Sequence, residues 1–431
     1  MKRYNEYKDS GVKWIGEIPR HWECRKLKTL LLSPLQYGAN ASGVPYSEHL
    51  PRYIRITDIT LEGKLKHSDK LSLSNEDAAK YILKDKDILF ARSGASVGKT
   101  FLYKKEYGLS AFAGYLIKAE LGKELIPELL FYFTQSDIYE SWKNGIFIQS
   151  TIQNIGADKY SQLQIAIPPL PEQEAIVTYL DSKVAKIDEY ISIAEKKIAA
   201  LEELKQTIIA EAVTRGIHKD VPMKDSGVKW IGEIPGHWDL KRTAMLFSEN
   251  RKKNINYEFD HALKFNYGKL VSKNEIGDVS SLKETYMAYT IINKNDIAIN
   301  CLNLNYDFVS QRVAISPQKG IITSAYLIIT PRQGVEAMYY NYLFKAMDSK
   351  KLFHGMGTGI RLTLSFSELK KQQIPVPLLS EQQEIVTYIE EKVANINQLC
   401  QAERSQIEKL KEYKQRLISD VVTGKVKVTN D

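Results

Sequence analysis

The sequence predicts an α+β fold in which two mixed α/β domains are separated by two long helices that form an antiparallel coiled coil. The fold is expected to be a pseudo-twofold internal repeat. The first observation is a 14-residue phrase, DSGVKWIGEIPRHW at 9–22, which returns at 225–238 with a single change. The second is a phrase beginning PPLPEQ at 168, which has a gapless counterpart beginning PLLSEQ at 377. A phrase that recurs at a long interval indicates that one structural unit occurs twice.

The stretches between these phrases, 23–165 and 239–373, differ almost everywhere. This pattern is typical of a fixed frame that presents two different surfaces. The phrases lie 216 positions apart at the start of the repeat and 209 apart at its end, so the second stretch is seven residues shorter. The C-terminus resembles the internal joint at 212–230, so we expect the two chain ends to meet and complete the repeat.

Each PEQ or SEQ phrase opens a long predicted helix, about 43 residues and ~65 Å in length. The stretch 172–214 contains neither glycine nor proline, and its apolar residues recur at alternating spacings of four and three, as in a coiled-coil seam. The seam residues are Leu180, Val184, Ile187, Ile191, Ile198 and Leu201 in the first copy and Ile389, Val393, Ile396, Ile407, Leu410 and Leu417 in the second. Lys205 and Lys414 interrupt the two seams at matching positions. We expect the helices to bury these seams against each other; the alternative is that each helix packs on its own domain.

Each variable stretch shows the apolar alternation of strands followed by a longer amphipathic helix. The expected strands are 52–58, 87–92, 99–104 and 111–119 in the first copy and 261–267, 295–301, 309–315 and 321–330 in the second. The expected helices are 126–143 and 335–352, with short helices at 158–164 and 366–372. The chain then divides into a mixed domain at 1–167, a long helix at 168–216, a second mixed domain at 217–376, and a second long helix with a C-terminal tail at 377–431.

The composition is that of a globular protein, with 43% hydrophobic residues among 431. A formal net charge of +8 fits a polyanionic partner without requiring one. No apolar run approaches the roughly 20 residues that cross a bilayer, and the N-terminus lacks the apolar core of a signal peptide. The sequence therefore predicts a cytoplasmic protein that does not associate with membranes. Cys24, Cys301 and Cys400 lie too far apart to suggest a disulfide framework or a zinc ribbon.

Two glycine-rich segments resemble nucleotide-binding loops but lack the required setting. Ser93–Thr100, SGASVGKT, has serine where the phosphate-binding motif needs its first glycine, and a strand is expected after it instead of a helix. The segment Gly355–Gly359 follows a helix and lacks the strand-turn-helix context. The seven histidines show no metal-ligand spacing, and no nucleophile with its base is recognisable. The sequence therefore predicts no catalytic residue and no metal site.

Polar side chains gather instead in loops at matching places of the two domains. Amide and guanidinium groups can contact base edges bidentately, whereas lysine and serine suit phosphates. The candidates for DNA contact are Arg92, Ser93, Lys99, Gln149, Gln153 and Asn154 in the first domain and Asn300, Asn303, Asn305, Arg312 and Arg361 in the second. A plain hairpin with solvated charges remains the alternative for 92–99, since residues of these types are more often surface hydrogen-bonding groups than base readers.

The order of these parts resembles the specificity (S) subunit of type I restriction-modification systems. The resemblance covers essentially the whole chain and is carried by the phrases at 8–22, 168–178, 224–238 and 377–387 and by ILFARSGASVGKT at 88–100. It implies a non-catalytic subunit that binds double-stranded DNA and carries two target recognition domains. Each of these domains would read one half of a split sequence, and the long helices would act as the spacer.

The resemblance also implies partner subunits. Two methylation (M) subunits would dock on this chain and methylate adenine with S-adenosylmethionine, and restriction (R) subunits would add ATP-driven, Mg²⁺-dependent translocation. We therefore expect no cofactor in this chain, and we expect S-adenosylmethionine, ATP and Mg²⁺ to be bound by its partner subunits. The second copy departs from the first in having Ser380 where the first has Pro171 and in lacking the ARSGAS segment. The alternative function is a coiled-coil assembly scaffold that does not bind DNA.

Overall fold

Two compact units make up the protein, and each contains one variable domain. The computed structural model describes residues 2–60, 63–147, 153–273, 279–309, 311–357 and 362–429. One unit comprises residues 1–194 and 404–431, and the other comprises residues 195–403. Each unit therefore combines a mixed domain with parts of both long helices.

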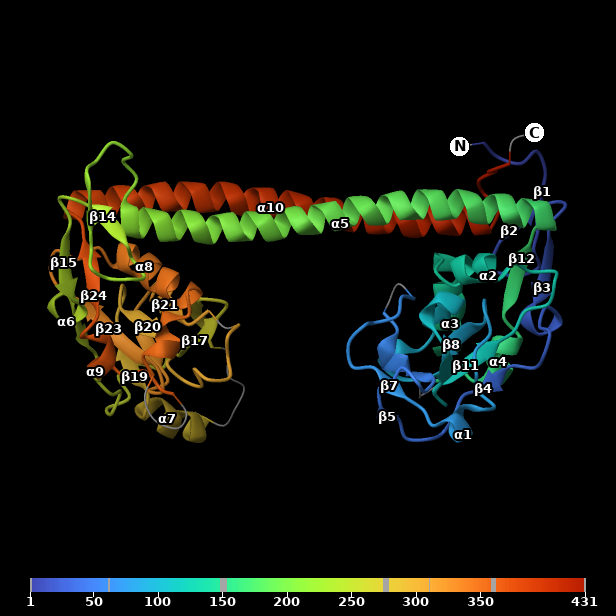
Figure 1. Ribbon diagram of the computed structural model, residues 1–431, viewed down its shortest axis with the longest axis horizontal. Coiled ribbons are helices and arrows are strands. Elements are labelled where there is room, and N and C mark those ends of the chain that lie inside the picture. The colour runs from blue at the N-terminus through green and yellow to red at the C-terminus, as the bar shows by residue number, and fades with distance from the viewer. Residues whose placement is uncertain are drawn as a thin grey trace. The chain divides into compact units, whose positions relative to one another are not determined.

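The first mixed domain is built on two four-stranded sheets (Figure 1). Its strands are β3 (Glu23–Lys26), β4 (Gln36–Tyr37), β5 (Val44–Pro45), β6 (Arg52–Ile54), β7 (Leu71–Ser72), β8 (Ile88–Ala91), β9 (Thr100–Leu102), β10 (Ser110–Phe112), β11 (Leu116–Ala119) and β12 (Gln164–Ile167), and its helices are α1 (Asn75–Ala78), α2 (Pro127–Phe133), α3 (Asp137–Phe147) and α4 (Ala157–Ser161). The sheets have the strand orders β4-β11-β8-β9 and β10-β6-β7-β5. Alternate residues of β8 pack on opposite faces, with Phe90 against α2 and α3 and Leu89 against the second sheet. Because both faces are covered, all four residues of β8 are buried.

The second mixed domain repeats one of these four-stranded sheets with a different sequence, and it has two two-stranded sheets in place of the other. Its strands are β15 (Asp239–Arg242), β16 (Phe247–Glu249), β17 (Leu263–Asn266), β18 (Lys269–Ser272), β19 (Thr290–Ile292), β20 (Ile297–Ile299), β21 (Val313–Ile315), β22 (Gly320–Ile322), β23 (Leu327–Pro331) and β24 (Gln373–Val376), and its helices are α6 (Thr243–Leu246), α7 (Val279–Met287), α8 (Ala337–Ser349) and α9 (Phe366–Leu369). The order β16-β23-β20-β21 matches β4-β11-β8-β9 of the first domain. Ile297 and Ile299 pack on α8, whereas Ala298 packs towards β17 and β18. The predicted fold class is confirmed.

Three expected elements are each divided in two. The stretch 111–119 forms β10 and β11, because a turn at Ala113 to Tyr115 reverses the chain; Leu116 N donates to Ala113 O at 2.8 Å. The stretch 321–330 likewise divides into β22 and β23. The helix expected at 126–143 breaks between α2 and α3, where the Ser136 hydroxyl accepts from Tyr139 N. Serine competes for backbone hydrogen bonds and so favours a new helix start.

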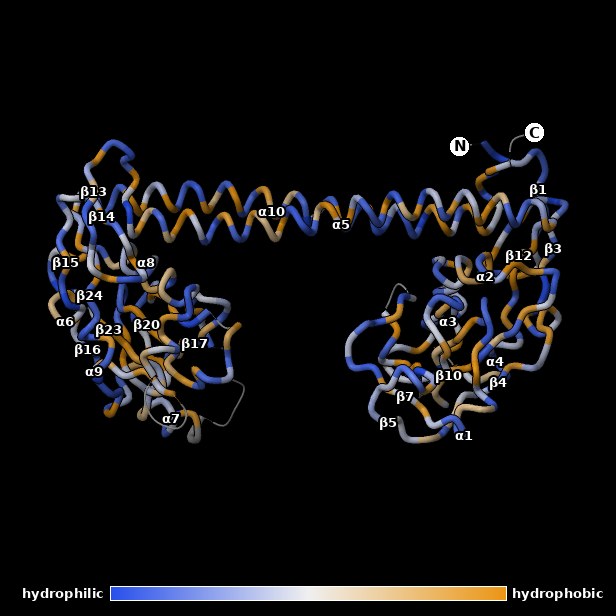
Figure 2. Tube along the Cα trace, in the orientation of Figure 1, coloured by the Kyte–Doolittle hydropathy of each residue, from blue (hydrophilic) through white to orange (hydrophobic). Residues whose placement is uncertain are grey.

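The two long helices are α5 (Leu170–Arg215) and α10 (Leu379–Val422), and they run side by side in each unit (Figure 1). Hydrophobic colour recurs along both (Figure 2), and every predicted seam residue is buried or half-buried. In the second unit Lys197 pairs with Glu403 and Lys205 with Asn397, so the helices are antiparallel there. In the first unit Lys414 pairs with Asp188 at 2.6 Å. The lysines that interrupt the seams therefore bind the partner helix.

The helices also pack on their own domains. Helix-to-helix contact and helix-to-domain contact, which the sequence offered as alternatives, therefore occur together. Ile176 and Leu180 of α5 share a core with Leu129 of α2, and the Tyr132 hydroxyl donates to Asp181. Ile385 and Ile389 of α10 take the equivalent places in the second unit. Each long helix thus has one apolar face for the other helix and one, near its start, for a domain.

The repeated Glu-Gln pair explains why the two phrases of the repeat occur together. Glu172 accepts from the indole Nε1 of buried Trp22 at 3.0 Å, and Glu381 does the same for Trp238 at 2.9 Å. Buried indole N–H groups require an acceptor. The following glutamines, Gln173 and Gln382, each accept from the backbone at the start of the domain's covering helix, both at 2.9 Å. One dipeptide therefore anchors both the tryptophan phrase and the domain to the long helix.

The chain ends meet as expected. Around the tryptophan phrases lie the hairpins β1 (Tyr7–Asp9) with β2 (Glu17–Pro19) and β13 (Met223–Asp225) with β14 (Glu233–Pro235). Near the termini Lys427 N donates to Lys2 O at 2.9 Å, and the Tyr7 hydroxyl donates to Gly424 O at 3.0 Å. The first unit is therefore closed by non-covalent contacts where the second has a continuous chain.

Replacing Gly424 by alanine is expected to destabilise the first unit more than Gly216→Ala destabilises the second. Both glycines follow a long helix with positive φ, +71° and +75°, which costs an alanine about 1–2 kcal/mol. A Cβ on Gly424 would also lie 2.4 Å from the Pro19 ring, whereas on Gly216 its closest neighbour would be Trp238 at 3.3 Å. Overpacking adds about 1–3 kcal/mol to the first case. Urea unfolding of both variants measures the difference, and equal losses would contradict the close approach.

Candidate nucleic-acid interface

The segment that resembles a phosphate-binding loop joins two antiparallel strands. β8 pairs with β9, and between them lies a single 3-10 turn at Gly94–Ser96. Gly94 and Gly98 have φ of +72° and +83°, a conformation that favours glycine. Thr100 opens β9, where a phosphate-binding loop would begin a helix. The two strands expected at 87–92 and 99–104 are confirmed, and a glycine turn joins them where a phosphate-binding loop would lead into a helix.

Four of the first domain's candidate residues lie together beside this turn. Ser93 forms an isolated bridge with Asn154, next to Gln153, and Ile155 N donates to Arg92 O at 2.8 Å. The Arg92 guanidinium lies over the Tyr37 ring, 5.0 Å from its centroid. Two buried polar atoms of this cluster, Arg92 Nε and Asn154 Oδ1, have no hydrogen-bond partner within the described residues. Such atoms at a surface cluster are suited to an incoming polar ligand.

The remaining candidates, Lys99, Gln149 and Arg361, are not part of this cluster as the structure describes it. Lys99 is half-buried on the far side of the turn, next to Gly98, against which the side chain of Lys143 packs. Gln149 lies outside the described residues, as does Arg361 of the second domain.

In the second domain the equivalent connection, between β20 and β21, is longer and differently built. Asn300 and Asn305 are half-buried, and Asn303 is exposed with a φ of +52°. The Asn300 side chain accepts from Leu302 N at 3.2 Å, so it closes a local turn, while the Asn305 Oδ1 atom is buried without a partner in the described part of the chain. Asn300 therefore stabilises the backbone of this connection, while Asn303 is exposed on its surface.

Arg312 departs from its expected role, because its side chain is fully buried. Its guanidinium donates to the backbone oxygens of Asn300 and Leu302 at 3.1 and 2.7 Å and to that of Asp307 at 2.7 Å. A side chain with no exposed surface cannot touch a base while these bonds persist. The geometry gives Arg312 the function of holding the connection in shape.

The candidates that the sequence missed are aromatic. Tyr37 and Tyr115 are 41% and 62% exposed beside Arg92, and Tyr306 and Phe308 are 81% and 54% exposed in the connection before β21. Tyrosine joins an apolar ring to a polar tip and is enriched at wet interfaces. The 25 tyrosines of the chain were the available signal, but a count does not say which of them are exposed.

A cationic pair lies at the same end of the second domain. Lys345 of α8 is mostly buried, and burial, together with the charge of Lys269, lowers its pKa to about 8. Burying an ammonium without a counter-ion is unfavourable. An anion bound beside Lys345 and Lys269 would offset the unfavourable burial of the Lys345 ammonium.

Substituting Lys345 by methionine is expected to stabilise the second unit at pH 7. Below pH 8 the lysine is charged in both the folded and unfolded states, so the penalty of the lowered pKa is fully present, and it disappears as the pH rises from about 8 towards 10.5. The pKa of the Cys301 thiol is raised to about 12 by burial, which gives an opposite slope above pH 9. The difference between wild type and Lys345→Met, measured by urea unfolding from pH 7 to 9.5, therefore isolates the lysine. A constant difference would contradict this assignment.

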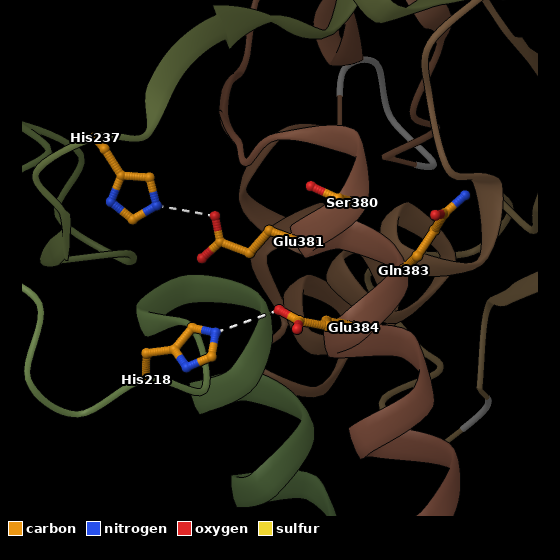
Figure 3. Close-up of a pocket in the computed structure, with 6 residues that line it drawn as sticks. All are labelled: His218, His237, Ser380, Glu381, Gln383 and Glu384. Atoms are coloured by element: carbon orange, nitrogen blue, oxygen red, sulfur yellow. Dashed lines mark hydrogen bonds and ion pairs between the residues drawn. The ribbon is translucent and has the colours of Figure 1, made fainter.

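A cavity of about 420 Å³ lies where the tryptophan phrase of the second unit meets α10. Figure 3 shows His237 facing Glu381 at 2.9 Å and His218 facing Glu384 at 3.3 Å. Each histidine is thus paired with one carboxylate, and Glu381 is already bound to Trp238. Within the ranges that the structure describes, no group of three or more His, Cys, Asp and Glu side chains could hold a metal ion. The cavity therefore lies at the contact between α10 and the tryptophan phrase.

Comparisons with known proteins agree with the duplicated fold. The family model for the type I restriction modification DNA specificity domain matches residues 53–203 and 223–409, one match for each half of the repeat. A putative type I restriction enzyme specificity subunit, MjaX of Methanocaldococcus jannaschii, is 25% identical over 98% of both chains. None of the helices in the described ranges combines the length and apolar character needed to span a membrane.

Solved structures share the fold. A chain from work on complex assembly and conformational transition of the type I R-M system superposes with a TM-score of 0.68 at 16% identity, covering 95% of this chain and 99% of that one. The HsdS subunit from Thermoanaerobacter tengcongensis gives a TM-score of 0.52 at 16% identity, covering 95% and 98%. At this identity the likeness establishes the fold.

Proposed function

This chain belongs to the family of type I restriction-modification specificity subunits, and we propose that it reads a bipartite target in double-stranded DNA, with one half-site for each mixed domain. The observation that carries the proposal is the contrast between the two connections. On matching sheets, the β8–β9 connection presents Arg92 and Ser93, with Asn154 bridged to Ser93, whereas the β20–β21 connection presents asparagines and aromatic residues. Equal scaffolds with unlike contact groups suit two different half-sites.

The duplicated frame supports the bipartite reading. Each long helix is continuous, with 46 residues in α5 and 44 in α10, and each belongs to both units. A continuous helix resists changes in length, so the two half-sites would be separated by a set number of base pairs. The non-specific part of the affinity would come from lysine and arginine contacts with phosphates, in line with the net charge of +8.

We further propose that this chain is non-catalytic and acts within an assembly in the cytoplasm. Two methylation subunits would dock on the duplicated frame, because a pseudo-twofold frame offers the same surface twice. Restriction subunits would complete the enzyme. S-adenosylmethionine, ATP and Mg²⁺ would then be bound by those partners.

Mapping of modified adenines in the source cell tests the proposal directly. DNA from cells with the intact gene should carry a split motif with an unspecified spacer, and DNA from a deletion strain should lack it. A modified motif that persists in the deletion strain would overturn the proposal.

A salt titration separates DNA reading from a scaffold function. Affinity of the assembled subunits for the mapped duplex should fall about 10³-fold or more between 50 and 200 mM salt if six or more phosphates are contacted. A coiled-coil scaffold without DNA binding would show no association at any of these concentrations.

A further inference from the structure

The second domain exposes a concentrated group of apolar side chains. In the segment 302–309, which we call the apolar tip, Tyr306, Phe308 and Val309 are 81%, 54% and 91% exposed. Tyr267, in the turn between β17 and β18, is 89% exposed. Concentrated apolar exposure on a folded domain marks a contact surface.

The two loops lie at one end of the domain. Gly268 follows Tyr267, and a Cβ on Gly268 would lie only 2.3 Å from Gln311 Oε1. The tip returns to β21 through Gln311, so the Tyr267 turn packs against the base of the tip. Tyr267 is therefore placed beside the tip residues.

The tip is held in one conformation from below. The buried Arg312 guanidinium bonds to backbone oxygens at both ends of the tip, those of Leu302 and Asp307, each at 2.7 Å. Asp348 of α8 fixes the backbone of Arg312 by accepting from its N–H at 2.8 Å. The His354 ring stacks on Phe308 with centroids 4.6 Å apart. A buried guanidinium must keep its acceptors, so moving the tip would leave a buried charge unpaired.

The charge next to the tip indicates an anionic partner. Lys269 follows the Tyr267 turn directly and is exposed, and Lys345 of α8 lies near it without an acidic partner among the described residues. An apolar surface flanked by cations suits duplex DNA, in which stacked bases are bordered by phosphates.

We propose that the apolar tip is a preassembled wedge that inserts between two base pairs of one half-site, with Tyr306 and Phe308 entering the stack and Arg312 acting as the positioning residue. This inference rests on the proposed function and deepens it. Apolar wedges partly unstack a base step and bend the duplex, and they favour flexible steps. The second domain would thus obtain part of its specificity from deformability, whereas the first relies on the polar cluster at Arg92.

The test uses the full chain co-expressed with its methylation subunit, without S-adenosylmethionine. The probe is the mapped duplex carrying 2-aminopurine, whose fluorescence rises on unstacking, at each position of the half-sites in turn. The modified adenine itself is excluded, because it is flipped for chemistry. Wild type is expected to raise the fluorescence several-fold at one step of one half-site.

The double variant Tyr306→Ala/Phe308→Ala should lose this signal and bind the duplex about 10- to 100-fold more weakly. Ile255→Ala, which removes an equally exposed apolar side chain of the same domain, is the matched control and should behave as wild type. Both changes lie at the surface, so folding of the domain is retained.

Arg312 is tested by Arg312→Met, which should lose the fluorescence signal, and by Arg312→Lys, which should restore part of it because one ammonium can still reach some of the carbonyl oxygens. Discrimination at the other half-site should stay unchanged in both, a result that general unfolding would not give.

Three outcomes overturn the inference. An unchanged signal in the double variant, with sequence-specific binding intact, removes the wedge and leaves the proposed function standing. Loss of methylation-subunit association with DNA binding retained would make the tip a protein-docking surface. Absence of sequence-specific binding by the wild-type assembly would instead refute the proposed function itself.

Discussion

Replacing residues 23–165 with the corresponding domain of another specificity subunit is expected to change one half-site completely and to leave the other unchanged. Each mismatched base pair costs about 1–3 kcal/mol, so a foreign domain with several new contacts discriminates against the old half-site by orders of magnitude. The second domain has its own core and its own sheets. Mapping of modified adenines in cells that express the chimera measures both half-sites at once.

The structure defines how the chimera should be joined. The exchanged part must keep a covering helix whose first backbone N–H reaches Gln173 and a tyrosine that can donate to Asp181, as Tyr132 does. It must also keep a backbone N–H that donates to the Ser419 hydroxyl of α10. In this chain the Asp137 N–H makes that hydrogen bond, at 2.8 Å. The reciprocal exchange of 239–373 is the matched control and should change the other half-site. A chimera in which both half-sites change would refute independent reading.

Trp238→Ala is expected to lower the free energy of unfolding of the second unit by about 3–5 kcal/mol, the range for removing a buried aromatic side chain. The indole is fully buried next to Gly216, and its loss also deprives the mostly buried Glu381 carboxylate of a donor. Unpaired buried polar groups add to the cost of the cavity. Urea unfolding followed by circular dichroism gives the size of the loss.

Hydrogen exchange locates this loss, because protection should fall in 195–403 and persist in the first unit. Trp22→Ala is the mirror experiment and should affect residues 1–194 and 404–431 instead. Trp238→Phe keeps most of the ring and removes only the N–H donor, so it should cost clearly less than alanine. Equal losses for phenylalanine and alanine would mean that the hydrogen bond to Glu381, and not the packing, dominates.

The repeat, the long helices and the seam could be predicted because each depends on spacing within one stretch of chain. Ile187 and Ile191 are four apart and therefore share a helix face, whatever lies elsewhere in the protein. The glycine turn at 94–98 was predictable for the same reason, since glycines between two apolar runs favour a reversal. The breaks at Ala113 and Thr134 were missed because apolar patterns continue across them.

The contact surfaces were predicted only in part. Arg92, Ser93 and Asn154 are candidates from two separate segments that the fold brings together, and 61 positions separate Ser93 from its partner Asn154. Arg312 is found in the core instead, because the carbonyl oxygens of 300–307 fold around its guanidinium. The local sequence around an arginine in a polar loop is the same whether its side chain is exposed or buried.

Periodicity and repetition, being local properties, were thus sufficient for the frame of this specificity subunit and for its two-fold plan. The exposure of Tyr306 and Phe308 and the burial of Arg312 depend on Asp348 and His354, which come from a helix and a turn much later in the chain. Whether a side chain can touch DNA is settled by such distant neighbours, since they determine which surface is left to solvent once the core has formed.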